Sequence, residues 1–371
     1  MFQNKHCRSK GENTMKVTLK DGSVKEYSEP MSVNDIAFDI AGGLGRAACA
    51  GEVDGEVVDL RTTIDKDCTL NILTFKDEAG KAAYRHTASH VMAEAVKNLF
   101  PEAKLAIGPS IDTGFYYDFE CQSFSRDDLD AIEKEMKKII KKGAKIERFT
   151  KSREDAIAFF KEKNEPYKVE LIEDLPEGEE ISFYSQGDWV DLCAGPHLMS
   201  TKGIKAFKLL SSSGAYWRGD ENKHMLTRIY GTAYATKDEL KEHLTQLEEA
   251  KKRDHNKLGR ELELFTTVDY IGQGLPILLP KGTKIIQTLQ RWVEDEEAKR
   301  GWQLTKTPLM AKSDLYKISG HWDHYKDGMF VMGDEEKDKE VFALRPMTCP
   351  FQYQAYLNRP RSYRDLPLRY D

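Results

Sequence analysis

The sequence predicts an α+β protein built from several domains, and three observations support this fold class. The chain has 371 residues, which exceeds the usual domain length of about 100–200 residues. Segments with the two-residue period of β-strands alternate with segments that have the 3.6-residue period of helices. With 40% hydrophobic and 10% aromatic residues, the composition is sufficient for hydrophobic cores. We therefore expect two or three domains.

Composition and charge exclude several classes of protein. No segment approaches the roughly 18 consecutive apolar residues of a transmembrane helix, so we expect no membrane association. Residues 1–14 lack the hydrophobic stretch of a secretory signal and are predicted to be a disordered extension. The 6 cysteines lack the spacing of a disulfide framework, which favours a cytoplasmic location. The net charge of −6 argues against general coating of nucleic acid but allows RNA binding through a local basic patch.

Residues 15–76 are predicted to form a β-grasp domain. Asp-Gly pairs at 21–22 and at 54–55 lie between alternating apolar and polar residues, which is a strong signal for hairpins. Ser32 caps a short helix between these hairpins, and residues 70–75 form a last strand. The order of hairpin, helix, hairpin and strand is typical of a β-grasp fold. Modules of this size are usually binding units.

Residues 80–236 are predicted to form an α+β domain. A helix covers residues 82–99 and ends before Pro101, and a second helix begins after Ser125 and ends at Gly143. The remaining predicted elements are a helix capped by Ser152 and strands at 183–193 and 206–210.

Residues 237–260 are predicted to be a charged linker helix with a narrow leucine stripe, and a solvated helix lying on one domain is the alternative. Residues 261–371 begin a third domain. Its first helix covers residues 283–300, and a strand at 307–310 follows. The sequence stops in an arginine-rich stretch without a closing element, so we expect this domain to be incomplete.

The first group of residues with chemical potential is His86-Thr-Ala-Ser-His90. A spacing of four residues on a helix places both imidazoles on one face. Zinc peptidases use this spacing with a glutamate after the first histidine, but Thr87 occupies that position and offers no general base. On its own, this pair is more consistent with two histidines on a half-buried helix face.

The second group is Asp191-Leu-Cys193-Ala-Gly-Pro-His197, which places a carboxylate, a thiol and an imidazole within one short segment. A buried cysteine and a turn histidine would be the simpler interpretation. Together with the first group, however, these residues supply a donor set of three histidines and one cysteine. That set suits a metal ion and acid–base catalysis equally well, and the spacing does not decide between them.

Two further features are ambiguous. Cys349 lies between prolines and could be a metal ligand, although a single cysteine is more often a core thiol. Residues 137–151 are strongly basic, which usually indicates a solvated helix face and alternatively a surface that contacts phosphates.

These segments together resemble the threonyl-tRNA synthetase family along nearly the whole chain. Residues 15–76 resemble its TGS domain. HTASH (86–90), GFYYDF (114–119), EPYK (165–168) and DLCAGPH (191–197) resemble its editing domain. The remaining segments resemble the start of the class II catalytic domain, an antiparallel sheet, up to its dimer-forming first motif: GLPILLPKG (274–282), TPLM (307–310), GHWDHYKD (320–327), FALRPMTCP (342–350) and SYRDLPLRY (362–370). The order of these parts is more specific than any one of them.

The resemblance implies a threonine–tRNA ligase that charges tRNA(Thr) using ATP with Mg²⁺. An apolar pocket separates a hydroxyl from an isosteric methyl by only about a hundredfold, so a zinc ion would select threonine over valine. Serine carries the same two zinc-binding groups and lacks one methyl, worth roughly 1–3 kcal/mol. Serine is therefore misactivated, and a second site must hydrolyse Ser-tRNA(Thr).

The resemblance also assigns residue roles. His86, His90 and Lys168 would position or activate a water in the editing site, and Asp191 and Cys193 would hold the seryl group or the terminal adenosine. His197 belongs to the same site, with Tyr117 nearby, and the family's site is thought to work without metal. In the catalytic domain, Met347 would line the threonine pocket and Cys349 would be one of three zinc ligands.

The sequence departs from the family pattern where the second class II motif should begin. The remaining zinc ligands and the ATP-binding arginines are not present in it, so we expect this chain not to aminoacylate alone. The complete enzyme would be a homodimer with one zinc ion per chain. The alternative function is a stand-alone deacylase for mischarged tRNA, and a third hypothesis is an RNA-binding module.

Overall fold

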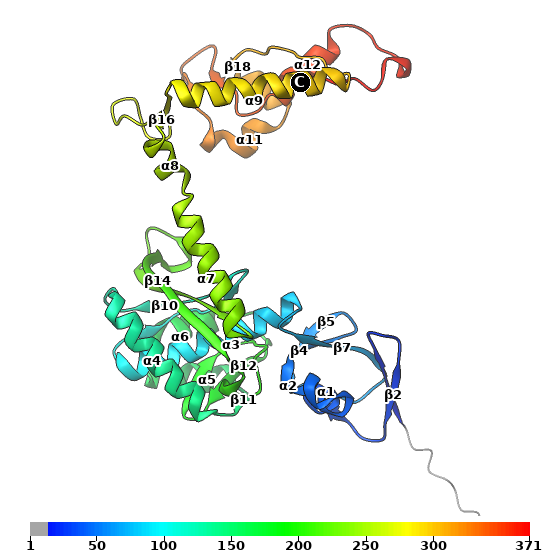
Figure 1. The fold of residues 1–371 in the computed structure, drawn as a ribbon, viewed down its shortest axis with the longest axis vertical. Helices are drawn as coiled ribbons and strands as arrows, with labels where there is room; N and C mark the ends of the chain where they lie inside the picture. The colour runs from blue at the N-terminus through cyan, green and yellow to red at the C-terminus, as the bar shows by residue number, and fades with distance from the viewer. Residues whose placement is uncertain (1–13) are drawn as a thin grey trace, which may run out of the picture. The chain divides into compact units, whose positions relative to one another are not determined.

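The computed structural model describes residues 14–371, which fall into two compact units (Figure 1). The first unit ends at Glu249, and the second unit runs from Ala250 to Asp371. Most of the predicted extension at residues 1–14 lies outside the described residues. Among the helices of residues 14–371, none combines the length and the apolar composition needed to span a bilayer.

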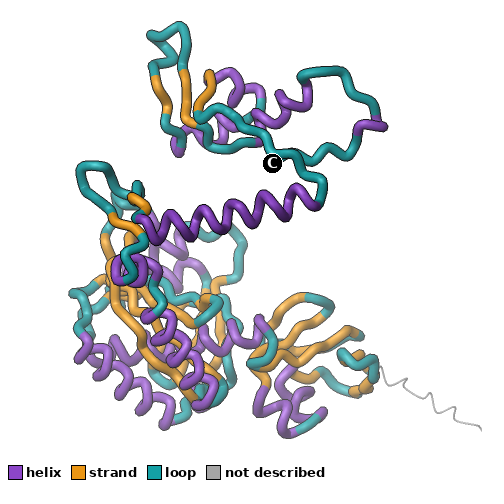
Figure 2. The backbone as a smooth tube through the Cα atoms, turned by 45° about the horizontal axis from the view of Figure 1, so that its top comes forward, coloured by secondary structure: helices purple, strands orange, loops and turns teal. Residues whose placement is uncertain are grey.

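The first unit begins with a five-stranded sheet in the order β2-β1-β7-β4-β5. β1 pairs with β7 in parallel and the other neighbours are antiparallel, which is the topology of a β-grasp fold. Helices α1 and α2 lie on one face of this sheet (Figure 2). The main elements are β1 (Met15–Leu19), β2 (Val24–Tyr27), α1 (Val33–Ile40), α2 (Gly42–Ala47), β4 (Ala48–Val53), β5 (Glu56–Val58) and β7 (Cys68–Thr74). A short pair of strands, β3 (Met31–Ser32) and β6 (Thr63–Ile64), completes the domain.

Local sequence signals explain these elements. Ser32 accepts a hydrogen bond from the backbone N–H of Asp35 and so caps α1. Asp54 and Gly55 both have positive φ angles, 51° and 90°, as a two-residue hairpin turn requires. The predicted hairpins and helix of this domain are therefore present.

The second part of the first unit is built around α3 (Glu78–Leu99), which is buried along most of its length. α3 packs on a sheet in the order β14-β15-β10-β8, and α4 packs beside it. α3 begins at Glu78, four residues before the predicted start at residue 82. The elements are β8 (Lys104–Leu105), β9 (Ser110–Ile111), β10 (Gly114–Glu120), α4 (Arg126–Lys142), β14 (Ala206–Tyr216) and β15 (Met225–Tyr234). Ser125 caps the start of α4 and forms a capping box with Asp128, and Gly143 caps its end in the left-handed conformation.

A second sheet, β11-β12-β13, completes this part with helices α5 and α6. The prediction of one strand over residues 183–193 is wrong. The segment forms a hairpin, because Gly187 adopts a φ of 67° between β12 and β13. The elements are β11 (Ile146–Lys151), α5 (Arg153–Glu162), α6 (Pro166–Glu173), β12 (Ile181–Gln186) and β13 (Trp189–Leu192).

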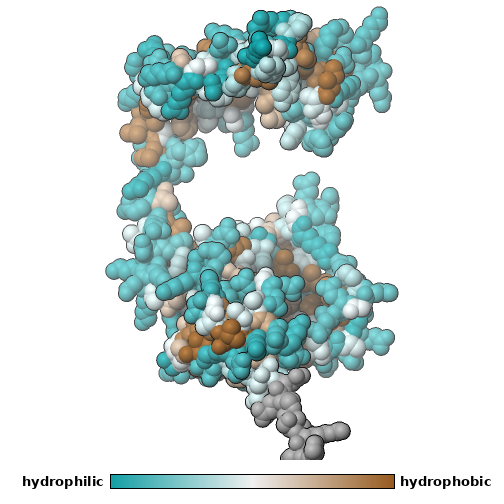
Figure 3. Space-filling view, turned by 90° about the vertical axis from the view of Figure 1, so that its right-hand side faces the viewer, coloured by the Kyte–Doolittle hydropathy of each residue, from teal (hydrophilic) through white to brown (hydrophobic). Residues whose placement is uncertain are grey.

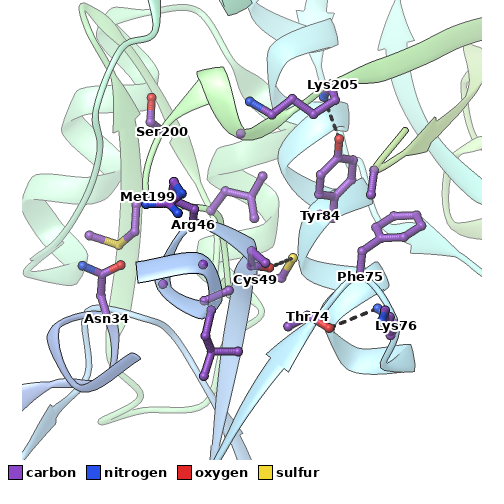
Figure 4. A pocket seen from close by; sticks show the side chains of 18 of the residues that line it. Asn34, Arg46, Cys49, Thr74, Phe75, Lys76, Tyr84, Met199, Ser200 and Lys205 are labelled. Atoms are coloured by element: carbon purple, nitrogen blue, oxygen red, sulfur yellow. Dashed lines mark hydrogen bonds between the residues drawn. The ribbon is translucent and has the colours of Figure 1, made fainter. Parts of the chain in front are cut away.

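The β-grasp domain packs against the α+β part within the first unit. A pocket of about 880 Å³ lies at this junction, with Arg46 and Cys49 on one side and Tyr84 and Lys205 on the other (Figure 4). The Tyr84 hydroxyl accepts from the backbone N–H of Lys205 at 2.7 Å and donates to the Tyr234 carbonyl at 2.8 Å. None of the seven residues predicted for the editing site lines this pocket.

The predicted helix at 237–260 consists of two helices. α7 (Lys237–Lys252) has no buried residues, and α8 (His255–Glu261) begins after a break at Arg253-Asp254. Asp254 caps α8 by accepting from the backbone N–H of Lys257 at 2.8 Å. The boundary between the two units falls within α7.

The second unit contains a long helix, a three-stranded sheet in the order β18-β20-β19 and several short helices. α9 begins at Pro280 and not at the predicted residue 283, because proline is favoured in the first turn of a helix. The predicted strand at 307–310 begins only at Met310. The elements are β16 (Phe265–Thr266), β17 (Ile277–Leu278), α9 (Pro280–Lys299), β18 (Met310–Lys312), α10 (Ser313–Ile318), α11 (His321–Tyr325), β19 (Val331–Met332), β20 (Phe342–Leu344) and α12 (Cys349–Leu357).

The apolar face of α9 is exposed within this unit. Its largest side chain, Trp292, is 60% exposed. Figure 3 colours each residue by hydropathy, and brown hydrophobic residues lie at the surface between teal hydrophilic ones. The small core of the unit centres instead on Tyr316, Trp322 and Ala343.

Candidate functional site

The seven residues predicted for the editing site all come together in the first unit. Helix α3 supplies His86 and His90, and β10 supplies Tyr117. α6 supplies Lys168. The remaining residues are on β13 and on the loop that follows it: Asp191, Cys193 and His197. The carboxylate, thiol and imidazole of one short segment thus meet the histidine pair of a helix more than 90 residues earlier.

Three imidazoles and one thiol form a tight cluster. The Cys193 sulfur lies 3.1 Å from Nε2 of His197 and 3.4 Å from Nε2 of His86. The ring centre of His197 lies 4.3 Å from those of both His86 and His90. His90 and His197 are buried, whereas His86 and Cys193 are partly exposed as residues, so the cluster comes nearest the protein surface on this side, its open edge.

Thr87, which lies between the two histidines on α3, sets the tautomer of His197. Its hydroxyl donates to the Ala83 carbonyl at 2.8 Å and accepts from the backbone N–H of Leu198 at 3.0 Å. Its remaining contact is with Nδ1 of His197 at 3.2 Å. With the single hydroxyl proton assigned to the Ala83 carbonyl, Nδ1 is the donor in this contact, which leaves the unprotonated Nε2 facing the Cys193 sulfur.

All three imidazoles are held in the neutral form. Burial lowers the pKa of His86 to about 4 and that of His90 to about 3, although the charge of Asp191 opposes both shifts. Burial, followed by the two neighbouring imidazoles, lowers the pKa of His197 well below its usual range. At neutral pH these rings therefore offer lone pairs and can act as bases.

Cys193 is a thiol and not a thiolate. Burial raises the pKa of Cys193 to about 12, although a hydrogen bond from the backbone N–H of Gly195 at 3.2 Å acts in the opposite direction. A thiol is a weak nucleophile, because the thiolate is the reactive form. The S–H group is therefore a hydrogen-bond donor to the neutral Nε2 of His197.

Asp191, Lys168 and Tyr117 form a buried polar group beside the imidazoles. The ammonium of Lys168 lies 2.6 Å from Oδ1 of Asp191, and Tyr117 donates its hydroxyl to Oδ2 at 2.7 Å. Burial alone would raise the pKa of Asp191, but the charge of Lys168 and its hydrogen bonds hold that pKa below its usual value. Oδ2 also lies 4.0 Å from Nε2 of His90 and so links this group to the imidazoles.

The imidazole–thiol cluster also fits a metal ion. The donor atoms of His86, His90, Cys193 and His197 lie within 4.8 Å of one another, the one such cluster of three or more groups within residues 14–371. Histidine nitrogens and cysteine sulfur are the usual ligands of tetrahedral zinc, and binding here would require Cys193 to lose its proton. Bound there, a zinc ion would supply a Lewis acid or a metal-bound water.

Met347 and Cys349 belong to the second unit and were predicted for a different site. The sulfur of Met347 lies 3.1 Å from Nε2 of His321, and Met347 lines a pocket of about 380 Å³ with His324 and Tyr325. Cys349 is exposed at the start of α12. A zinc ion at Cys349 would need further ligands, which the described residues do not gather around it.

Sequence reasoning did not identify several residues that hold the site together. Thr87 was considered only as the residue that replaces a catalytic glutamate, although its place between the two histidines was visible. Tyr184 packs its ring on His197 with centres 4.5 Å apart, and Asp59 and Arg61 contact the backbone of His197 from the β-grasp domain. No local signal relates residues 59 and 61 to a histidine more than 130 positions later.

Two domain families match the chain and define its class. Residues 15–74 match the TGS domain, and residues 181–230 match the family described as the Threonyl and Alanyl tRNA synthetase second additional domain. The chain is therefore a multidomain α+β protein with a TGS domain and a synthetase-type editing domain.

The relatives narrow this class further. The chain is 65% identical over 357 residues to the threonine–tRNA ligase of Clostridium perfringens (strain SM101 / Type A), an alignment that covers 96% of this chain and 55% of that enzyme. It is 66% identical to the threonine–tRNA ligase of Clostridium botulinum (strain Eklund 17B / Type B) and 56% identical to that of Acetivibrio thermocellus, with the same coverage. The chain is thus homologous to threonine–tRNA ligases and spans about half the length of these curated relatives.

Among solved structures, the chain is similar to the RNA binding domain of threonyl-tRNA synthetase from Cryptosporidium parvum Iowa II. The two are 34% identical, the match covers 32% of this chain and 29% of the other, and the TM-score is 0.30.

Proposed function

We propose that residues 80–236 form an editing site that hydrolyses Ser-tRNA(Thr) for a threonine–tRNA ligase. The observation that carries this proposal is the cluster of three neutral imidazoles and a thiol, in which His86 and Cys193 are partly exposed. Ester hydrolysis can proceed with a positioned water and a group that is unprotonated at neutral pH to accept its proton, without a covalent intermediate. The relatives named threonine–tRNA ligase give the substrate class.

In this mechanism, a water at the open edge of the cluster donates a proton to an imidazole nitrogen and attacks the seryl ester carbonyl. The bond to the terminal ribose oxygen then breaks, and that oxygen takes up the proton as serine leaves. His86 is the best placed base, because its ring is neutral and it is the one partly exposed residue among the three histidines of the cluster. His197 fixes the Cys193 thiol beside His86, and the Cys193 sulfur lines the place of the water and the seryl group.

Lys168 and Asp191 have a supporting role in this proposal. Lys168 is 3% exposed and Asp191 is fully buried, so neither reaches a water at the open edge. Their ion pair, with Tyr117, holds the carboxylate of Asp191 next to His90 and keeps this side of the imidazole–thiol cluster rigid. We therefore assign water activation to the histidines and not to Lys168.

The test measures hydrolysis of seryl- and threonyl-tRNA(Thr) by the purified chain in single-turnover assays. We expect Ser-tRNA(Thr) to be cleaved at least tenfold faster than Thr-tRNA(Thr), and His86→Ala to reduce the rate by about 100-fold, the contribution of one general base. Chelator treatment and metal analysis of the active protein separate metal-free chemistry from a metal-bound water. Cleavage that is unaffected by His86→Ala and His197→Ala would disprove this site.

The activity of the whole protein is also a proposal. We infer ATP-dependent charging of tRNA(Thr) with threonine by a cytoplasmic homodimer, with Met347 in the threonine pocket and Cys349 as a zinc ligand. Mg²⁺ would accompany ATP. Homology with threonine–tRNA ligases over 357 residues supports this inference. Threonine-dependent pyrophosphate exchange measures it independently of editing.

A further inference from the structure

We propose that Asp59 and Arg61 of the β-grasp domain are positioning residues for His197 in the editing site. The inference rests on the proposed function, because it concerns how the same site is held in its active geometry. In this proposal, residues of the β-grasp domain contribute to the editing site, although all seven residues predicted for that site lie in the domain at residues 80–236.

Asp59 connects three groups through its two carboxylate oxygens. Oδ2 accepts from the backbone N–H of His197 at 3.1 Å and from the hydroxyl of Tyr184 at 3.0 Å. Oδ1 accepts from the backbone N–H and from Nη1 of Arg61, each at 2.8 Å. The Asp59 side chain is 9% exposed, so these bonds form in a largely dry environment where charge-assisted bonds are strong.

Arg61 binds the same loop through carbonyl oxygens. Its Nη1 donates to the carbonyl of His197 at 3.2 Å, and its Nη2 donates to that of Leu198 at 2.8 Å. Its Nε donates to the carbonyl of Ile146 on β11 at 2.9 Å. Because guanidinium is planar and its donors have fixed directions, these bonds restrict the loop in orientation as well as in position.

The two sets of bonds divide the control of His197 between two domains. The β-grasp residues hold its backbone N–H and its backbone carbonyl, as just described. Its own domain holds the ring, through Thr87 at Nδ1, Cys193 at Nε2 and the ring of Tyr184. Tyr184 joins the sets, because its hydroxyl donates to Asp59 while its ring packs on His197.

This arrangement predicts a catalytic effect and not only an attachment between domains. A displacement of about 1 Å in a catalytic group can cost about 100-fold in rate. Loss of either oxygen of Asp59 releases the backbone of His197 or the guanidinium that holds its carbonyl. An amide at position 59 retains only one of these oxygens, so it cannot reproduce all four bonds.

The experiment compares Asp59→Asn with Asp54→Asn in the full chain. Asp54 lies in the same domain, accepts from the backbone N–H and hydroxyl of Thr69, and loses no acceptor oxygen in those bonds when changed to asparagine. We expect Asp59→Asn to lower the maximal single-turnover rate on Ser-tRNA(Thr) by 10- to 100-fold. The enzyme concentration for half-maximal rate should change less than twofold, and Asp54→Asn should change neither value.

A double-variant cycle then tests whether Asp59 acts through His197. In a His197→Ala background, Asp59→Asn should cause less than a twofold further loss, because the group it positions is gone. If Asp59→Asn fails to fold, Arg61→Lys should reproduce the loss of maximal rate. Lysine keeps the positive charge but lacks the separate guanidinium nitrogens that donate to Asp59, His197 and Leu198. A weaker tRNA interaction with an unchanged maximal rate, or full additivity with His197→Ala, would overturn the proposal.

A readout without substrate separates this proposal from the proposed function. With ¹⁵N-labelled histidine, the ring signals of His197 should show Nδ1 protonated in the chain and in Asp54→Asn, and a mixture of tautomers in Asp59→Asn. If the chain does not cleave Ser-tRNA(Thr), the proposed function fails, and these signals still decide the positioning role. Identical His197 signals in all three proteins would refute it.

Discussion

The ammonium nitrogen of Lys168 lies 2.6 Å from a carboxylate oxygen of Asp191, and the two side chains are 3% and 1% exposed. Tyr117 contacts both partners, donating to Asp191 and accepting from Lys168 at 2.9 Å. Two opposite charges without water depend on each other, because either charge alone would be left unpaired in the interior. A substitution of either residue should therefore strongly destabilise the buried polar group of Lys168, Asp191 and Tyr117 beside the imidazoles.

We predict that Lys168→Met lowers the free energy of unfolding by about 3–5 kcal/mol, the usual result of removing one partner of a buried ion pair. Chemical denaturation followed by circular dichroism measures this change. Lys145→Met is the control, because Lys145 and Glu147 form a pair with side chains 71% and 59% exposed and should leave the midpoint unchanged. Equal midpoints for Lys168→Met and Lys145→Met would show that the pair is not enclosed as described.

Sequence signals predicted several turns and helix caps of the first unit, because these features depend on neighbouring residues. The Asp-Gly turns at 21–22 and 54–55, the Ser32 cap and the Ser125 capping box are all local, and all are present. The hairpin at 181–192 was missed although its signal is local. Gly187-Asp188 is a two-residue Gly-Asp loop between two strand-like segments, which is a hairpin signal that was available in the sequence.

The residue types that form the candidate site could be predicted from the sequence. The residues that hold His197 in place from another domain could not. The histidine pair and the segment from Asp191 to His197 stand out by composition, whereas Lys168 and Tyr117 entered only through the family resemblance. Asp59 and Arg61 lie in a different domain from His197, and only the packing of the two domains brings them together. Long-range packing of this kind leaves no trace in local periodicity.

We predict that the buried histidines make the protein less stable as the pH falls. An unfolded His90 binds a proton near pH 6.5, but burial lowers its pKa in the folded state to about 3. Protonation therefore favours the unfolded chain, and the stability present above pH 6.5 is lost between about pH 6.5 and pH 3. His90→Gln should reduce this dependence by about 1.4 kcal/mol per pH unit, as measured by denaturation at pH 7 and pH 5.

Val91→Ala is the control for His90→Gln, because Val91 is buried beside it on α3 and does not titrate. Its loss of packing should lower stability equally at pH 7 and pH 5. A slope of stability against pH that is the same in His90→Gln and in Val91→Ala contradicts the low pKa of His90.

We predict that Cys193 reacts slowly with thiol reagents and forms no covalent intermediate. Burial raises the pKa of Cys193 to about 12, so almost none of it is thiolate at pH 8. Iodoacetamide should label the exposed Cys349 at least about tenfold faster than Cys193, as measured by peptide mass spectrometry. During hydrolysis of Ser-tRNA(Thr), rapid quenching should trap no seryl thioester.

Cys349→Ser provides the control for this labelling, because it removes the fast site and should leave the slow rate at Cys193 unchanged. Labelling of Cys193 as fast as Cys349, or a seryl adduct on Cys193, is the result that would reject water as the direct nucleophile.

The last prediction concerns Gly108, whose backbone touches the ring of Tyr117. A Cβ atom at Gly108 would lie 2.0 Å from Cδ2 of Tyr117, so Gly108→Ala must displace the ring and weaken its hydrogen bond to Asp191. We expect the free energy of unfolding to fall by about 1–3 kcal/mol, as for overpacked cores, and editing to slow with it. Gly43→Ala, where a Cβ meets nothing within 4 Å, should change neither. In a Tyr117→Ala background the clash disappears, so Gly108→Ala should cost no further stability there, and an undiminished cost would place the strain elsewhere.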